Sequence, residues 1–253
     1  MDSQNYLMVA VGLSVLLYAV VTHLTWAYRR RQADLPALRP RGSYPPEFWV
    51  EQIGRLVYYI GLPYVMLREG IGSARMMGLT GWSASSAIPL TIVVALAAFF
   101  LLSIFWRRCI SSLPALGDSL EGRLVSVSPR AAVTLEVIYL GVHWAFYRSA
   151  FIFWFGGDYY AGSFLGLLLV IAERLTNPEV RFALRHSELA VFEVSQWGLA
   201  LCVTTAFFFS RSLAFVIGLQ WLLAMGTFPA GQALIRTCLA SAPASSTASS
   251  ESR

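Results

Sequence analysis

Long apolar stretches recur along the chain, and they constrain its fold more than any other feature of the sequence. The clearest one runs from residue 86 to residue 106 and is followed directly by Arg107 and Arg108. About 20 apolar residues in an α-helix match the hydrocarbon thickness of a bilayer. Hydrophobic residues make up 57% of the 253 residues and charged residues only 13%, whereas a soluble domain carries about 25% charged residues. The sequence therefore predicts an integral membrane protein.

Hydropathy predicts an all-α fold, a polytopic transmembrane helical bundle of about seven spans (six to eight), in a single domain over residues 1–240. The second span carries Glu51 and Arg55 near its start and the fifth is short, so either could be re-entrant or interfacial. The first apolar run is too long for a cleaved signal core and has no basic region before it. The expected spans are 6–28, 49–67, 86–106, 131–155, 161–172, 189–209 and 213–235.

Arginines gather in alternate loops and predict the orientation of the bundle. They follow the first span, lie between the third and the fourth, separate the fifth from the sixth and follow the seventh. Alternation of the spans brings these loops to one side of the membrane, and the positive-inside rule makes that side cytoplasmic. We therefore expect the N-terminus outside and the C-terminus in the cytoplasm, in a cell membrane that is most simply a bacterial plasma membrane.

Charge and cysteine patterns argue against several other classes. All 19 basic residues are arginines in short clusters beside apolar stretches, so nucleic acid is not an expected partner. The three cysteines show neither metal-ligand nor disulfide spacing, and no phosphate loop or known protease motif is present, so no cofactor is expected.

Two segments are expected outside the bundle, a proline-rich loop at 36–46 and a disordered tail at 241–253.

Polar side chains inside the fourth span mark the first candidate site. Glu136, His143 and Tyr147 fall at helical spacing and share one face. A charged side chain near the middle of a span costs about 2.5–3.5 kcal/mol, so such residues face a partner or a wet cavity. This stripe fits a proton relay, a metal site or a hydrogen-bond network between helices. Arg148 lies nearer the outer end of the span, where we expect its side chain to extend toward water.

Two later spans carry further polar residues. Glu193 and Gln196 lie three residues apart in the sixth span, and Gln220 lies in the middle of the seventh. Glu136 and Glu193 are nearer the cytoplasmic ends of their spans, where snorkelling lowers the cost of burial. We expect Gln220 to form a hydrogen bond that holds two helices together. The Gly-x-x-x-Gly motif of close helix pairs is absent from the clean spans.

Three segments within residues 131–230 carry a further pattern: His143-Trp144-Ala145-Phe146-Tyr147-Arg148, Phe182-Ala183-Leu184-Arg185-His186 and Gln220-Trp221-Leu222-Leu223-Ala224. Their order resembles the CAAX-protease and bacteriocin-processing (CPBP) family of polytopic intramembrane proteases. The motifs of that family are Glu-Glu-x-x-x-Arg, Phe-x-x-x-His and His-x-x-x-Asn. Here the first motif keeps only its arginine, Arg148, the second fits through His186, and the third has Gln220 in place of its histidine and lacks the asparagine.

The resemblance implies the architecture of that family with a degenerate site. In the family the first glutamate and the histidines activate a water for peptide hydrolysis, so their loss removes the general base and the metal ligands. The sequence therefore favours a protein that is not an enzyme, with a residual CAAX-type peptidase activity as the least favoured reading. The candidate site residues are Glu136, His143, Arg148, His186, Glu193 and Gln220.

Three functions remain open from the sequence. The first is a non-catalytic protein that binds or organises other membrane proteins in the lipid bilayer. The second is a subunit or assembly factor of a larger membrane complex. The third is a transporter or proton-path component that uses Glu136, His143 and Glu193, which requires these side chains to line one wet path.

Overall fold

The chain is helical wherever the structure describes it. The computed structural model describes residues 3–33, 52–80, 84–112 and 130–225, and these residues contain helices and turns but no strand. The predicted all-α class is therefore confirmed for this part of the chain. The helical elements are α1 (Ser3–Ala33), the π-helical turn η1 (Val57–Gly61), α3 (Leu62–Arg68), α4 (Ala74–Met77), α5 (Ala84–Ser112), α7 (Arg130–Trp154), α8 (Tyr159–Thr176), α9 (Pro178–Leu184), α10 (Ser187–Ser210) and a last helix over Leu213–Met225.

Each predicted span that lies fully within the described residues coincides with one helix, but the end of the fifth was wrong. The sequence indicated that it fades at Ala172, whereas α8 continues through Glu173 to Thr176. At its start, the Asp158 carboxylate caps α8 by accepting hydrogen bonds from the backbone N–H groups of Tyr160 and Ala161 at 2.9 and 3.1 Å. Glu173 therefore belongs to a packed helix and not to a charged loop.

Several sequence predictions fall outside the described residues. These are the proline-rich loop at 36–46, the start of the second span at 49–51, the end of the seventh span at 226–235 and the tail at 241–253.

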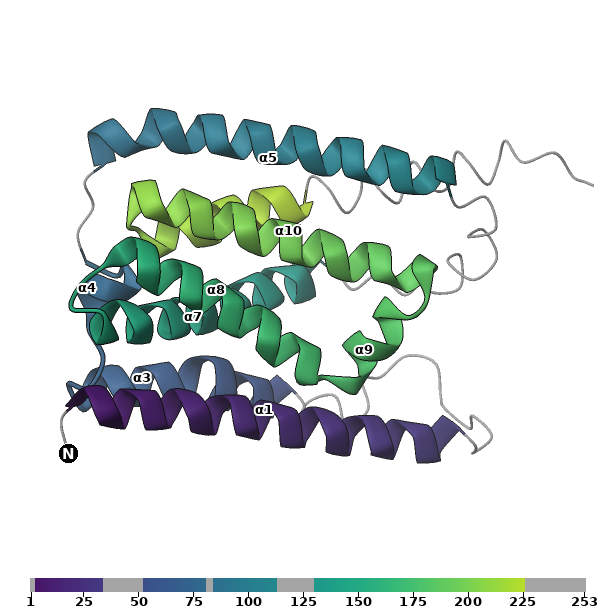
Figure 1. The fold of residues 1–253 in the computed structure, drawn as a ribbon, viewed down its shortest axis with the longest axis horizontal. Helices are drawn as coiled ribbons and strands as arrows, with labels where there is room; N and C mark the ends of the chain where they lie inside the picture. The colour runs from purple at the N-terminus through teal and green to yellow at the C-terminus, as the bar shows by residue number, and fades with distance from the viewer. Residues whose placement is uncertain (1–2, 34–51, 81–83, 113–129, 226–253) are drawn as a thin grey trace, which may run out of the picture.

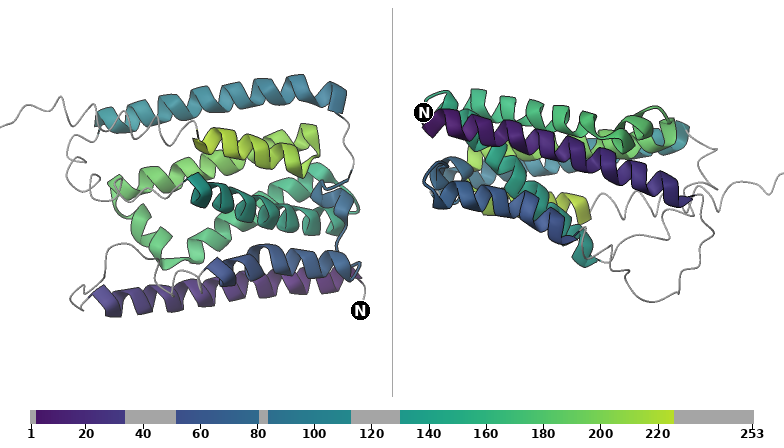
Figure 2. Two further views of the ribbon diagram at one scale, coloured as in Figure 1. Left: turned by 180° about the vertical axis from the view of Figure 1, so that it is seen from behind. Right: turned by 90° about the horizontal axis from the view of Figure 1, so that it is seen from below.

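Helix α7 lies at the centre of the bundle. It contacts α8, α4, α1, η1 and α3. With α8 and α10 it lies between α5 on one side and α1 with α3 on the other (Figure 1), and Figure 2 shows the same order from behind. Ala145, Tyr147 and Ile152 of α7 expose none of their surface. A helix that is covered on most sides can hold polar groups away from solvent and lipid.

Two glycines on α8 let it approach α7 closely. A Cβ atom on Gly162 would lie 2.4 Å from the backbone nitrogen of Ile152, and one on Gly166 would lie 2.8 Å from the Cα of Arg148. Gly162 and Gly166 are one turn apart and form a Gly-x-x-x-Gly motif, which brings helix backbones together. The motif lies in the span that hydropathy marked least clearly, so a search of the clean spans did not find it.

One described helix is long and apolar enough by itself to cross a membrane. It is the stretch Gln4–Tyr28 of α1, which has 25 residues and a mean hydropathy of 2.2. The helices Pro89–Phe105 and Leu213–Met225 are apolar but shorter. The helical class and one membrane-capable helix are thus established for the described residues, and the number of spans stays a prediction.

We expect Gly162→Ala to lower the free energy of unfolding by about 1–3 kcal/mol, because the added methyl group overlaps the backbone of α7. Gly218→Ala is the matched control, since a Cβ atom there meets nothing within 4 Å. Alanine is favoured over glycine within a helix by about 1 kcal/mol, so the control should be neutral or stabilising. Titration with a denaturing detergent measures the unfolding midpoints of both purified variants. Equal midpoints would contradict the close packing of α8 on α7.

Candidate functional site

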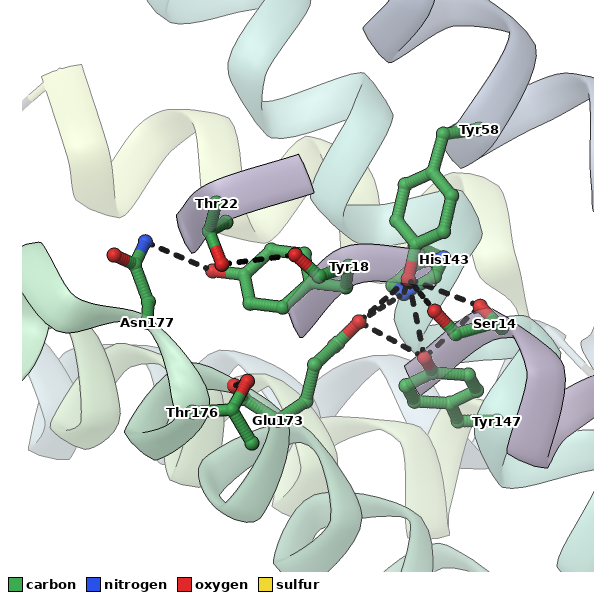
Figure 3. Close-up of polar contacts among 9 residues, drawn as sticks. All are labelled: Ser14, Tyr18, Thr22, Tyr58, His143, Tyr147, Glu173, Thr176 and Asn177. Carbon is green, nitrogen blue, oxygen red and sulfur yellow. Dashed lines mark hydrogen bonds and ion pairs between the residues drawn. The ribbon is translucent and has the colours of Figure 1, made fainter. Parts of the chain in front are cut away.

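A buried polar cluster is centred on the carboxylate of Glu173 in α8 (Figure 3). Its Oε1 accepts hydrogen bonds from the hydroxyls of Tyr58 and Tyr147 at 2.6 and 2.9 Å. The Nε2 of His143 lies 3.2 Å from the same oxygen. Glu173 is 3% exposed and His143 is 1% exposed. A buried carboxylate needs donors that replace its hydration, and hydrogen bonds to a charged acceptor are about twice as strong as neutral ones.

Helix α1 closes the cluster through Ser14. The Ser14 hydroxyl donates to the Tyr58 hydroxyl at 3.0 Å and lies 3.0 Å from that of Tyr147 (Figure 3). One turn further along α1, the Tyr18 hydroxyl accepts a hydrogen bond from the side-chain amide of Asn177 at 3.3 Å. Polar contacts therefore join α1 to η1, to α7 and to the α8–α9 junction.

The π-helical turn η1 holds two consecutive tyrosines against one imidazole ring. The ring centroids of Tyr58 and Tyr59 lie 4.8 and 4.9 Å from that of His143. Tyr59 also stacks on Tyr139 of α7, with centroids 6.0 Å apart and 10° between the planes. Single π-turns inside α-helices occur frequently at functional sites. The aromatic rings surround the polar atoms with apolar surface and keep the hydrogen bonds in a low dielectric.

The residues of the predicted polar stripe on α7 contact two different partners, Glu173 and Arg55. His143 and Tyr147 both reach Glu173, whereas Glu136 forms an ion pair with Arg55, whose side chain is 27% exposed. The other predicted acidic residue, Glu193 of α10, pairs with Arg174 of α8 at 2.9 Å. Glu136 and Glu193 are therefore neutralised by arginines near the edge of the bundle, and they do not contribute to the cluster.

His186 and Gln220 are not bonded to His143 within the described residues, although Gln220 packs against α7 at Gly141. His186 is exposed at the end of α9, where its Nδ1 lies 2.8 Å from the carbonyl oxygen of Phe182. Gln220 is 1% exposed, and its Oε1 has no hydrogen-bond partner, so the expected bond between helices is not formed by this atom. Within the described part of the chain, no hydrogen bond joins His186 or Gln220 to His143.

The expectation that Arg148 extends toward water was wrong. Its side chain is 3% exposed, and its Cζ lies 3.3 Å from the ring centroid of Phe207 in α10. Gly166 lets α8 rest against the backbone of α7 at this position, so α8 and α10 cover the face from which Arg148 projects. A guanidinium over an aromatic ring gains about 2 kcal/mol when it is desolvated.

Sequence reasoning missed Ser14, Tyr58 and Glu173. A signal for Glu173 was present, because the buried positions of α8 include Ser163, Gly166, Val170 and Glu173, which follow a helical period. The glutamate thus belongs to the same stripe as the small residues that pack on α7. Ser14 lies one turn before Tyr18 within an apolar span, which is a weaker signal of the same kind.

The cluster can do two things chemically. A carboxylate, an imidazole and two phenols within hydrogen-bond distance can share or pass a proton. Alternatively, the same bonds fix the positions of four elements relative to one another. Among the described residues, no three or more His, Cys, Asp or Glu side chains converge as a metal site requires.

Comparison with known protein families, with curated proteins and with solved structures finds no match.

We expect Tyr147→Phe to lower the free energy of unfolding by about 1–3 kcal/mol, because it removes one of the donors to a buried carboxylate. Tyr64→Phe is the control, since Tyr64 is 63% exposed and the loss there should stay within about 0.5 kcal/mol. Detergent-induced unfolding followed by tryptophan fluorescence measures the difference. If both variants unfold at the same midpoint, the hydrogen bond to Glu173 contributes nothing.

Proposed function

We propose that the protein is a multi-pass membrane protein with seven spans, which acts by binding within the membrane and not by cleaving peptides. Its main support is that the Glu173 carboxylate, the Nε2 atom of His143 and the two phenols of the buried cluster bond to one another, while the Nδ1 atom of His143 has no hydrogen-bond partner among the described residues. Glu173 accepts hydrogen bonds from two tyrosines and lies against His143, and the Ser14 hydroxyl contacts both tyrosines. A hydrolytic carboxylate or imidazole must instead present these atoms to a water and a substrate. The cluster then serves to hold the binding surfaces in place.

The outer helices support the membrane location. Helices α1 and α5 lie on opposite sides of the bundle (Figure 1). Soluble monomers rarely expose a contiguous apolar patch of more than a few hundred Å², whereas lipid tails are as apolar as these side chains. Each of the following is at least 60% exposed: Leu13, Leu16 and Leu24 on α1, and Leu96, Phe100 and Leu101 on α5.

The direction of the helices supports the proposed orientation. The ends of α1, α5 and α8 and the start of α10 lie toward the end of the bundle opposite the N-terminus (Figure 1). Arginines are concentrated there, and under the positive-inside rule that end is cytoplasmic. The arginines of these helix ends and of α9 are Arg29, Arg30, Arg31, Arg107, Arg108, Arg174, Arg181 and Arg185, against Arg68, Arg75 and Arg211 at the other end.

Single cysteines test this orientation in a variant whose three native cysteines are replaced by serine. We expect Glu69→Cys to react with a membrane-impermeant maleimide in intact cells, because it lies at the end with few arginines. We expect Glu179→Cys, which is also exposed, to react only after permeabilisation. Reaction of both in intact cells, or recovery of the protein in the soluble fraction, would contradict a multi-pass bundle of this orientation.

We infer from the resemblance to the CPBP family that the helical bundle descends from a protein of that family. His143 stands where that family has the first glutamate of its Glu-Glu-x-x-x-Arg motif. In this chain the buried carboxylate beside His143 comes from Glu173 on the following helix. On this proposal the ancestral hydrolytic site has become a set of contacts that stabilises the fold.

A second candidate function is a proton path, and the cluster itself is the observation that favours it. Ionisable side chains buried within a membrane bundle mark proton relays in pumps and transporters. Hydrogen bonds run from Ser14 through the tyrosines to Glu173 and His143. The relevant residues are then Glu173 and His143, since arginines already pair with Glu136 and Glu193.

Purified wild-type protein separates these functions. We expect it to retain a membrane partner at fixed stoichiometry in mild detergent and to hydrolyse no CAAX or unmodified peptide, because its carboxylate and imidazole bond to each other. A peptidase activity that His143→Ala abolishes would contradict the binding function. A pH-driven proton flux in proteoliposomes that is lost in Glu173→Gln but kept in the control Glu193→Gln would establish the second candidate instead.

A further inference from the structure

We propose that a small anion of about the size of chloride binds beside Arg148, in a cavity between α7, α8 and α10. This site lies on a different face of α7 from the Glu173 cluster, and its existence does not depend on the proposed function.

The first observation is a buried cation without a counter-charge. Arg148 is 3% exposed, and its Nε and Nη2 atoms have no hydrogen-bond partner in the part of the chain that the structure describes. The buried or half-buried acidic side chains that the structure describes on α8 and α10 are already engaged, Glu173 with His143 and Glu193 with Arg174. Removing a cation from water without a partner is far costlier than burying a paired one. The aromatic face of Phe207 compensates only one side of the guanidinium.

The second observation is a cavity at the guanidinium. Its volume is about 10 Å³. Arg148 lines it together with Ser163, Gly166 and Thr204. A cavity of this volume has room for about one water molecule or one monatomic ion.

The third observation is that each polar side chain that lines the cavity can donate a hydrogen bond. The Ser163 hydroxyl is buried and has no hydrogen-bond partner, and the Thr204 hydroxyl belongs to another lining residue. A guanidinium can only donate, and a hydroxyl is free to rotate its hydrogen toward an acceptor. Gly166 contributes no side chain and so leaves room. A monatomic anion accepts from all of these groups at once and also neutralises Arg148, which a water molecule does not.

Chloride titration of the purified protein tests the site. We measure the thermal unfolding midpoint in sodium chloride and in sodium gluconate of equal ionic strength, together with the width of the chloride NMR resonance. A ligand of the folded state raises the midpoint with its concentration. We expect a chloride-dependent rise and saturable line broadening in the wild type, and the loss of both in Arg148→Met. Arg174→Met, which removes a paired arginine, should keep the chloride dependence.

A milder pair of variants covers the case in which Arg148→Met fails to fold. Ser163→Ala should weaken chloride binding about ten-fold, since it removes one hydrogen bond to a charged group. Ser149→Ala should leave it unchanged, because the Ser149 hydroxyl donates to the carbonyl of Phe146 on the same helix. The proposal is overturned if the wild type unfolds identically in both salts without line broadening. It is equally overturned if Ser163→Ala and Ser149→Ala bind chloride alike.

Discussion

A carboxylate that is taken out of water must find donors that replace its hydration, and Glu173 finds them on two other elements of the chain. Tyr58 comes from η1, and His143 and Tyr147 come from α7, while Ser14 of α1 bonds to the tyrosines in turn. Because an unpaired buried charge is so costly, these elements cannot shift independently. The positions of η1 and α8 around α7 are therefore coupled through one oxygen atom, and α1 is joined to them through the hydroxyl of Ser14.

Charged groups on two faces of α7 differ in whether they have a partner of opposite charge among the described residues. On one face, His143 and Tyr147 bond to a carboxylate from α8, so the acid and its donors balance within the protein. On the adjacent face, Arg148 is enclosed by α8 and α10 with an aromatic ring but no acid. Residues 147 and 148 are neighbours in sequence, yet the helix turns them about 100° apart. A single helix thus carries one polar site whose carboxylate is bonded within the protein and one buried guanidinium with unpaired donors among the described residues.

Hydropathy was sufficient to find the long helices, because length and apolarity are properties of each segment by itself, but it did not indicate the short helices α4 and α9. The spacing of His143 and Tyr147 likewise placed them on one face, since a helical period is local. Glu173 and Arg148 could not be placed in this way. Their burial depends on which face of α8 meets α7, and that is decided by the close approach at Gly162 and Gly166. The burial of a side chain between two helices cannot be predicted from either helix alone. The small residues Gly162 and Gly166 were the only signal of this contact in the sequence.

The π-helical turn η1 has a consequence for how this chain can vary in length. Relative to an α-helix, the turn accommodates one additional residue over Val57–Gly61. Deleting one residue there would yield a regular α-helix of ordinary local stability. Because the turn takes up its extra residue locally, the flanking turns would stay in register, and the side chains of the turn itself would change direction. Tyr58 and Tyr59 would then lose their contacts with either the His143 imidazole or the Glu173 carboxylate. This segment is therefore far less tolerant of a single-residue deletion than of most substitutions.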